Sequence, residues 1–178
     1  MTELHFDLTL YPDPLLRRPA APVGGFDEEL RAIVAGMFER MYASKGVGLA
    51  APQVGLKKRI LVLNPTGSPE DEHVLVNPRI LERSGPLTLF EEGCLSFPGI
   101  YAEVERPEQC RVQAQRPDGT SFEETFGGFT SRVIQHEYDH LEGVLLVDRM
   151  SPADRLRHKA ALDELVARFR KKTASVRR

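Results

Sequence analysis

Two histidines four residues apart, with a glutamate directly after the first, are the most chemically specific feature of the sequence. They are His136, Glu137 and His140. On an α-helix, residues i and i+4 lie on the same face, so both imidazoles can bind one divalent metal without distorting the backbone. The glutamate lies about 100° further round, at roughly 3.6 residues per turn, where it can reach a metal-bound water. The spacing therefore predicts a metal site on a helix.

The residues around this motif predict a buried helix. A glycine pair at 127–128 interrupts the preceding strand pattern, Thr130 or Ser131 can cap the helix, and Gly143 suits the position after its end. The apolar run 144–147 predicts a buried strand next. Chance occurrence of the motif on a surface helix is the alternative. Burying two histidines beside an ionisable glutamate is costly unless something binds them, which favours a metal.

A catalytic metal site needs a third protein ligand and an open position for water. Asp and Glu residues are also candidates for this third ligand. His5, His73 and His158 lie in terminal or polar contexts and are expected at the surface. Cys110 alternates with apolar residues and is predicted to be a core thiol. Cys94 follows a glycine at the end of a predicted strand, where the chain turns, and the spacing modestly favours it as the ligand.

The composition predicts one globular domain over residues 1–178. With 178 residues and 41% hydrophobic content, the chain can bury a core, and its net charge of −2 gives no general reason to expect nucleic-acid or membrane binding. No apolar run approaches the roughly 20 residues that span a bilayer, and no leader peptide is evident. We therefore expect a cytoplasmic protein with free thiols. No feature determines the oligomeric state, and a monomer is the expectation.

Strands separated by turns and not by helices predict an α+β fold with antiparallel pairing around the central metal-binding helix. After a short opening strand, prolines between residues 11 and 22 argue against a helix there. Asp27 caps a helix whose apolar residues follow a 3.6-residue period, and Pro152 begins a long final helix. Further strands are expected at 59–63, 73–80, 87–90, 101–105, 110–115 and 121–126.

Residues 46–55 form a predicted loop of small residues. The loop lacks the spacing of the glycine-rich loops that bind nucleotide phosphates, so a nucleotide site is a weak alternative. Small residues also allow a peptide backbone to approach closely. Gln53 would bring one neutral amide to that surface.

Three segments together resemble the signature motifs of the peptide deformylase family. They are GVGLAAPQ at 46–53, EGCLS at 92–96 and QHEYDHL at 135–141, in the order typical of the family. The opening segment is also similar, so the resemblance extends from about residue 8 to 150. It implies a hydrolase that removes the formyl group from the N-terminal formyl-methionine of newly made polypeptides and releases formate.

The resemblance also implies the roles of the matching residues at the metal. Cys94, His136 and His140 match the metal ligands, with water as the fourth ligand and as the nucleophile, and Glu137 matches the general base and acid. The ligand set is compatible with iron(II), zinc, nickel or cobalt. The affinity order alone favours zinc over iron. The family points instead to iron(II) as the ion bound in the cell.

Other matching residues contact the substrate. Gln53 and the backbone amide of Leu95 match the groups that stabilise the oxyanion. The family's pocket for the methionine side chain matches three small or branched residues, Val47, Gly48 and Val133. The glycines of this segment would let the substrate backbone pair with the enzyme as an added strand.

Five further residues bear on the surroundings of the site. Gln135, Asp139 and Arg106 are expected to orient the metal ligands. Tyr101 stands where some bacterial members have arginine, and Arg132 stands where others have an aliphatic residue. Because of these two departures, the resemblance does not define the rim of the substrate site. The three motifs are unaffected.

The chain ends in a basic segment, residues 168–178. A frayed, solvated helix end accounts for it, since cations favour the C-terminal end of a helix dipole. Docking onto ribosomal RNA accounts for it equally well, because the family acts on nascent polypeptides at the ribosome.

Two other classes of protein fit part of the pattern. A zincin-type metalloprotease shares the histidine motif, but its third ligand normally lies downstream, where His158 is the one histidine available. A non-catalytic binding module stabilised by a metal would need a closed four-ligand site. In such a module Glu137 would have no role.

Overall fold

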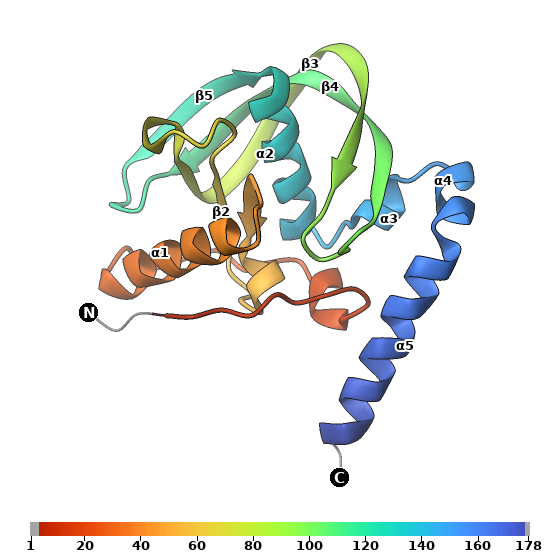
Figure 1. Ribbon diagram of the computed structural model, residues 1–178. Helices are drawn as coiled ribbons and strands as arrows, with labels where there is room; N and C mark the ends of the chain where they lie inside the picture. The colour runs from red at the N-terminus through yellow and green to blue at the C-terminus, as the bar shows by residue number, and fades with distance from the viewer. Residues whose placement is uncertain (1–3, 177–178) are drawn as a thin grey trace.

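One antiparallel sheet is the frame of the structure, a computed structural model that describes residues 4–176. Its five strands follow one another in sequence order, and every neighbouring pair is antiparallel (Figure 1). The strands are β1 (Gly48–Ala50), β2 (Ile60–Leu63), β3 (His73–Gly93), β4 (Tyr101–Gln115) and β5 (Ser121–Gly127). Short connections permit only antiparallel pairing between successive strands, and the predicted α+β fold is confirmed.

The long β3–β4 hairpin replaces four of the strands expected from the sequence. The segments 73–80 and 87–90 belong to β3, and the segments 101–105 and 110–115 belong to β4. The pairing shifts register three times along the hairpin. Such bulges interrupt the alternation of apolar and polar residues, so the sequence does not show that each pair of segments is one continuous strand. They also bend the hairpin, which curves around α2 (Figure 1).

The helices cover this sheet and extend from it. They are α1 (Glu28–Ala43), α2 (Gly128–Leu141), α3 (Leu146–Arg149), α4 (Pro152–Arg157) and α5 (Lys159–Val176), with 3-10 turns η1 (Pro14–Arg17), η2 (Ala51–Val54) and η3 (Pro69–Asp71). The Asp27 carboxylate accepts from the Leu30 N–H at 3.1 Å, so the predicted cap of α1 is confirmed. No helix within residues 4–176 combines the length and apolar character needed to cross a membrane.

Helix α2 lies against the concave side of the sheet and is buried along ten of its 14 residues. Ile134 and Leu141 pack in one core with Leu61 and Cys110, as predicted for this thiol. The helix begins at Gly128 with Gly127 as its N-cap, so the prediction of Thr130 or Ser131 as cap was wrong. Glycine tolerates the positive φ of 57° at position 128, which the chain needs to turn from β5 into the helix.

Several local predictions were wrong because contacts distant in sequence override the local pattern. The opening segment forms no strand within the described residues, although Thr9 N–H donates to the Gln53 carbonyl at 2.7 Å. The proline-rich segment contains η1, and the loop 46–55 contains β1 and η2. The apolar run 144–147 leads into α3, where Asp148 accepts from the Leu145 N–H at 2.8 Å. The final helix is divided into α4 and α5 at His158.

Candidate metal centre and substrate cleft

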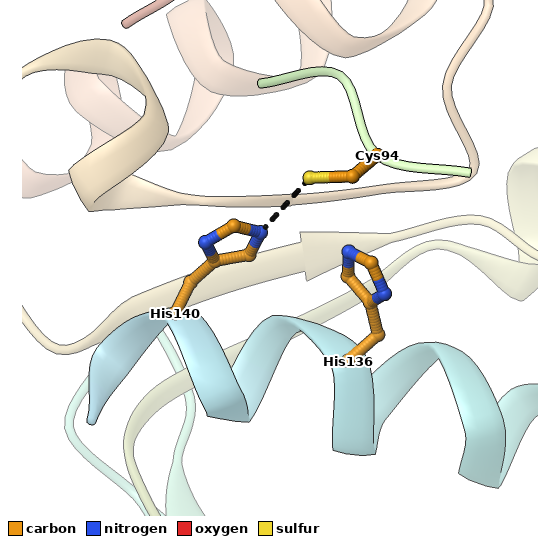
Figure 2. Close-up of side chains that lie close together, drawn as sticks. All are labelled: Cys94, His136 and His140. Atoms are coloured by element: carbon orange, nitrogen blue, oxygen red, sulfur yellow. Dashed lines mark hydrogen bonds between the residues drawn. The ribbon is translucent and has the colours of Figure 1, made fainter. Parts of the chain in front are cut away.

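Three potential metal ligands converge from two elements. His136 and His140 rise from one face of α2, and Cys94 reaches them from the turn after β3 (Figure 2). The Cys94 sulfur lies 3.3 Å from Nε2 of His140, and one donor atom from each residue lies within 4.8 Å of the others. One sulfur and two imidazole nitrogens suit a first-row transition metal. The structure thus brings together the ligand set expected from the sequence.

Two buried atoms beside this cluster test whether the site fits a metal. Oε2 of Glu137 and Nδ1 of His140 have no hydrogen-bond partner among residues 4–176. A buried carboxylate oxygen without a partner is costly, and a water held by a cation would give it one. The residues present therefore fit a bound divalent metal with a water within reach of Glu137.

Glu92 is a functional residue that the sequence analysis missed. Its Oε2 lies 2.9 Å from Nδ1 of His136, which orients the imidazole and leaves Nε2 for the metal. Arg106 holds the other side of the same carboxylate through Nε at 2.7 Å and Nη2 at 3.0 Å. The signal available in the sequence was an acidic residue two positions before Cys94. Its partner is 44 residues away, so only the fold brings the pair together.

The ion pairs continue beneath the histidine helix. Asp139 accepts from Arg106 Nη1 at 2.9 Å and from Arg149 Nη2 at 2.6 Å. Arg106 and Asp139 therefore reach the ligands through Glu92, whereas Gln135 donates to the Pro107 carbonyl at 2.9 Å and contacts no ligand side chain. The site thus rests on a charged network under α2.

Burial and hydrogen bonds together determine the acid–base character of the site. Burial raises the pKa of Glu137 to about 7. Burial alone would raise the pKa of Glu92, but hydrogen bonds from His136 and Arg106 outweigh it and lower the pKa to about 2. For His136, burial lowers the pKa, but hydrogen bonds with Cys94 and Glu92 raise it by more than burial lowers it. The pKa of His136 therefore lies well above its usual range. The site therefore holds a carboxyl group able to accept and return a proton near neutral pH, and a bound cation would lower its pKa.

Gln53 is a potential hydrogen-bond donor beside the metal cluster. The Gln53 side chain is buried, and its Oε1 accepts from the Ala50 N–H at 2.9 Å. This bond points Nε2 towards the cluster, 3.3 Å from Ser96 Oγ and 3.6 Å from the Cys94 sulfur. Gln53 can therefore donate to a ligand oxygen near the metal, and the Leu95 N–H, directly after Cys94, is left without an acceptor within the described part of the chain.

A cleft of about 510 Å³ opens beside the metal cluster. The three residues expected to line a side-chain pocket, Val47, Gly48 and Val133, all contribute to it. A Cβ at position 48 would lie 2.6 Å from Glu137 Oε1 and 2.7 Å from Val133 Cγ1, so only glycine leaves the carboxylate in place. Three aromatic residues, Phe90, Tyr101 and Phe129, also line the cleft, and of these only Tyr101 was expected near the substrate, at its rim.

The fold and the three converging residues define an α+β protein with a candidate metal site. Residues 6–156 match the model of the family described as polypeptide deformylase. The chain is 45% identical over 180 residues to the chloroplastic/mitochondrial peptide deformylase 1B of Arabidopsis thaliana, which covers 97% of this chain and 65% of that protein. It is 46% identical over 151 residues to the peptide deformylase of Thermotoga maritima, a match that covers 85% of this chain and 90% of that protein.

A solved structure agrees with these matches. The crystal structure of a plant peptide deformylase superposes with a TM-score of 0.93 at 44% identity, covering 98% of this chain and 96% of that one. The chain belongs to the polypeptide deformylase family, a family of metal-dependent enzymes, and the family predicted from the three motifs is confirmed. It spans less than two thirds of the length of the Arabidopsis relative.

Proposed function

We propose that this protein is a metal-dependent peptide deformylase. It hydrolyses the N-formyl group of an N-terminal formyl-methionine on a nascent polypeptide and releases formate. The observation that carries this proposal is the convergence of Cys94, His136 and His140 beside the unpaired Glu137 carboxylate, in a chain of this family. We further propose that residues 1–178 act as one catalytic domain and that the protein is a monomer.

Cys94, His136 and His140 would hold one divalent cation, supported by the geometry of their donor atoms. When bound, the cation would supply a Lewis acid that lowers the pKa of water from about 15.7 towards roughly 7. We propose iron(II) as the ion in the cell and zinc, nickel or cobalt as substitutes in isolated protein. A ferrous ion beside a thiolate is sensitive to oxygen and peroxide, so purification in air should reduce activity.

The residues of the chain perform the proton transfer and the charge stabilisation. Glu137 takes a proton from the attacking water and delivers it to the methionine nitrogen as the bond to the formyl carbon breaks, a contribution of roughly 10²–10⁴ in rate. Gln53 Nε2 and the Leu95 N–H donate to the formyl oxygen as negative charge develops there. Val47, Gly48 and Val133 line the cleft for the methionine side chain.

Two observations weigh against the other classes of protein. Within residues 4–176, the ligand group contains Cys94 and does not contain His158, which a zincin-type site would require. The group has three ligands and not the four of a closed structural site. Glu137 beside it would be costly in a protein without acid–base chemistry.

The direct test is formate release from a formyl-Met-Ala-Ser peptide by protein reconstituted without oxygen. Activity should appear with iron(II) or nickel(II), disappear with a chelator, and leave internal bonds of an unformylated peptide intact. Cleavage of that unformylated peptide without formate release would contradict the proposal. Comparing activity per bound metal for iron, nickel and zinc, with and without peroxide, tests the metal: a zinc form equal to a peroxide-resistant iron form would contradict iron(II).

The partners and the compartment form a further part of the proposal. We propose that the protein works in the cytoplasm and that the basic C-terminal segment docks on ribosomal RNA. Arg168, Arg170, Lys171 and Lys172 are exposed on α5, whereas Arg177 and Arg178 lie outside the described residues. Ribosome co-sedimentation should weaken with salt and with deletion of residues 168–178. Unchanged co-sedimentation after the deletion would contradict docking, and detection in an organelle fraction would contradict the compartment.

A further inference from the structure

Arg132 is a buried cation that the proposed reaction does not use. It lies on α2 one turn before His136 and is 6% exposed. Its Nη1 donates to Glu92 Oε1 at 2.8 Å and to the Val104 carbonyl at 2.9 Å. Its Nη2 donates to the Thr88 carbonyl at 2.6 Å and to the Thr88 hydroxyl at 2.8 Å. One side chain of α2 therefore connects the carboxylate under a metal ligand with both strands of the curved hairpin.

The charges nearby show that Glu92 does not need Arg132 for neutralisation. Arg106 already binds both oxygens of Glu92, and Asp139 pairs with Arg106 and Arg149. Three guanidinium groups therefore face two carboxylates, and Arg132 is the one that donates to Thr88 of β3. A buried charge is costly unless its hydrogen bonds compensate it, and two of the four bonds of Arg132 go to Thr88.

The strand that Arg132 holds forms one side of the substrate cleft. We name the β3 segment Thr88–Phe90, of which Phe90 lines the cleft, the cleft wall. Thr88 and Phe90 point to the same face of the strand because they are two residues apart. The Arg132 guanidinium lies 5.4 Å from the centroid of the Phe90 ring, which in turn lies 6.0 Å from the Phe129 ring. Phe90, Phe129 and Arg132 all line the cleft, and Phe90 is 51% exposed, so few other contacts fix its position.

We propose that Arg132 is a positioning residue that fixes the cleft wall against α2 and thereby sets the affinity of the cleft for the peptide substrate. The inference rests on the proposed deformylase function. Phe90 of the cleft wall lines the same cleft as Val47, Gly48 and Val133. If the cleft wall is already held in place, peptide binding does not carry the entropic cost of ordering it. Removing the contacts that Arg132 makes should therefore weaken peptide binding.

The main test is Arg132→Met, which keeps most of the side-chain volume and removes the donors. We expect KM for formyl-Met-Ala-Ser to rise about tenfold while kcat stays within about twofold, because substrate binding weakens while the interactions specific to the transition state remain. Calorimetry with the unformylated peptide Met-Ala-Ser should show a similar loss of affinity without any turnover.

Matched variants separate positioning from stability. Thr88→Val removes one acceptor of Arg132 and should raise KM in the same direction by a smaller factor. Arg149→Met removes a cation from the far end of the same network, where the side chain is 42% exposed and does not line the cleft, and should leave KM unchanged.

Each other outcome contradicts the inference. A fall in kcat at unchanged KM would mean that Arg132 acts through Glu92 and His136. A lower melting temperature with unchanged KM and peptide affinity would mean a structural role alone. If Arg132→Met does not fold, an unchanged KM in Thr88→Val overturns the inference. Absence of formate release by the metal-loaded wild type would contradict the proposed function, and equal affinities of wild type and variant for Met-Ala-Ser would contradict the role of Arg132.

Discussion

The two helices α2 and α5 differ in what surrounds them, and the difference explains where chemistry is possible. Helix α2 is enclosed by the sheet and by the curved β3–β4 hairpin, whereas α5 projects from the body of the protein (Figure 1). Ten of the 14 residues of α2 are buried. On α5, the buried side chains among the described ones are Leu162 and Leu165.

This contrast shows that fixed geometry comes from contacts on every side. Glu92 holds His136, and the Cys94 sulfur lies beside His140, so the donor atoms of the three ligands lie together. Such precision is required for catalysis, because a small misplacement of a reacting group is costly in rate. The exposed cations of α5 have no comparable constraint, so they can provide charge but not a precise site.

The largest effect is expected for Glu137→Ala on α2. Turnover should fall by about 10²–10⁴, because the proton carrier is removed while the three ligands stay. Metal content and melting temperature should remain near those of the wild type. Glu142→Ala, at the exposed end of the same helix, is the control and should retain full formate release. Turnover at the wild-type level in Glu137→Ala would show that the proton carrier has been assigned wrongly.

The next largest effect concerns the two thiols. Cys94→Ala should lower metal affinity by more than the roughly 10–100-fold that loss of an outer partner of a ligand causes, because it removes a ligand itself. Cys110→Ala alters the core and should leave metal content unchanged, since this thiol is buried away from the cluster. Elemental analysis of both purified variants measures the difference. Equal metal loss would exclude Cys94 as the specific ligand.

A backbone position provides a third test of precision around α2. Gly48→Ala places a Cβ where Glu137 Oε1 and the Val133 side chain now lie, at 2.6 and 2.7 Å. Displacing the carboxylate by about 1 Å should reduce kcat/KM by about 10²-fold. Gly24→Ala, where no atom lies within 4 Å of the added carbon, should have no effect. If Gly48→Ala is fully active, the close approach is not required.

The sequence predicted those features that depend on nearby residues. The i, i+4 spacing of His136 and His140, the Asp27 cap and the apolar period of α1 are local, and all three are found in the structure. The three motifs also indicated that Cys94 joins the histidines, although spacing alone favoured it only modestly.

What could not be predicted depends on contacts between distant residues. Glu92 and His136 meet across 44 residues, and Arg132 reaches Thr88 across the same separation. The length of β3 could not be predicted because bulges interrupt the alternation of apolar and polar residues along it. The run 144–147 was misassigned as a strand because its helical turn is stabilised by a hydrogen bond from the Leu145 N–H to the Asp148 carboxylate, which hydrophobicity alone does not reveal.

Core truncations compare the stability contributed by the two helices. Ile134→Ala on α2 should lower the free energy of unfolding by about 2–5 kcal/mol, because its neighbours cannot collapse into the cavity. Leu165→Ala on α5 should cost less, since solvent borders that helix and the surroundings can relax. Leu156→Ala, where the side chain is 75% exposed, is the control and should stay within about 0.5 kcal/mol. Urea unfolding measures all three, and a larger loss for Leu165→Ala would reverse the comparison.

The smallest effect is expected from the cations of α5 in the purified protein. Arg170, Lys171 and Lys172 are all exposed, and surface substitutions of this kind usually change stability by no more than about 0.5 kcal/mol. Replacing all three with glutamine should therefore leave urea unfolding and formate release from a tripeptide unchanged. The same variant should no longer co-sediment with ribosomes at low salt, because a protein that neutralises fewer phosphates releases fewer of the counterions that drive binding. A lower kcat/KM on the tripeptide would show instead that α5 contributes to the site, and the division of roles between the two helices would then be wrong.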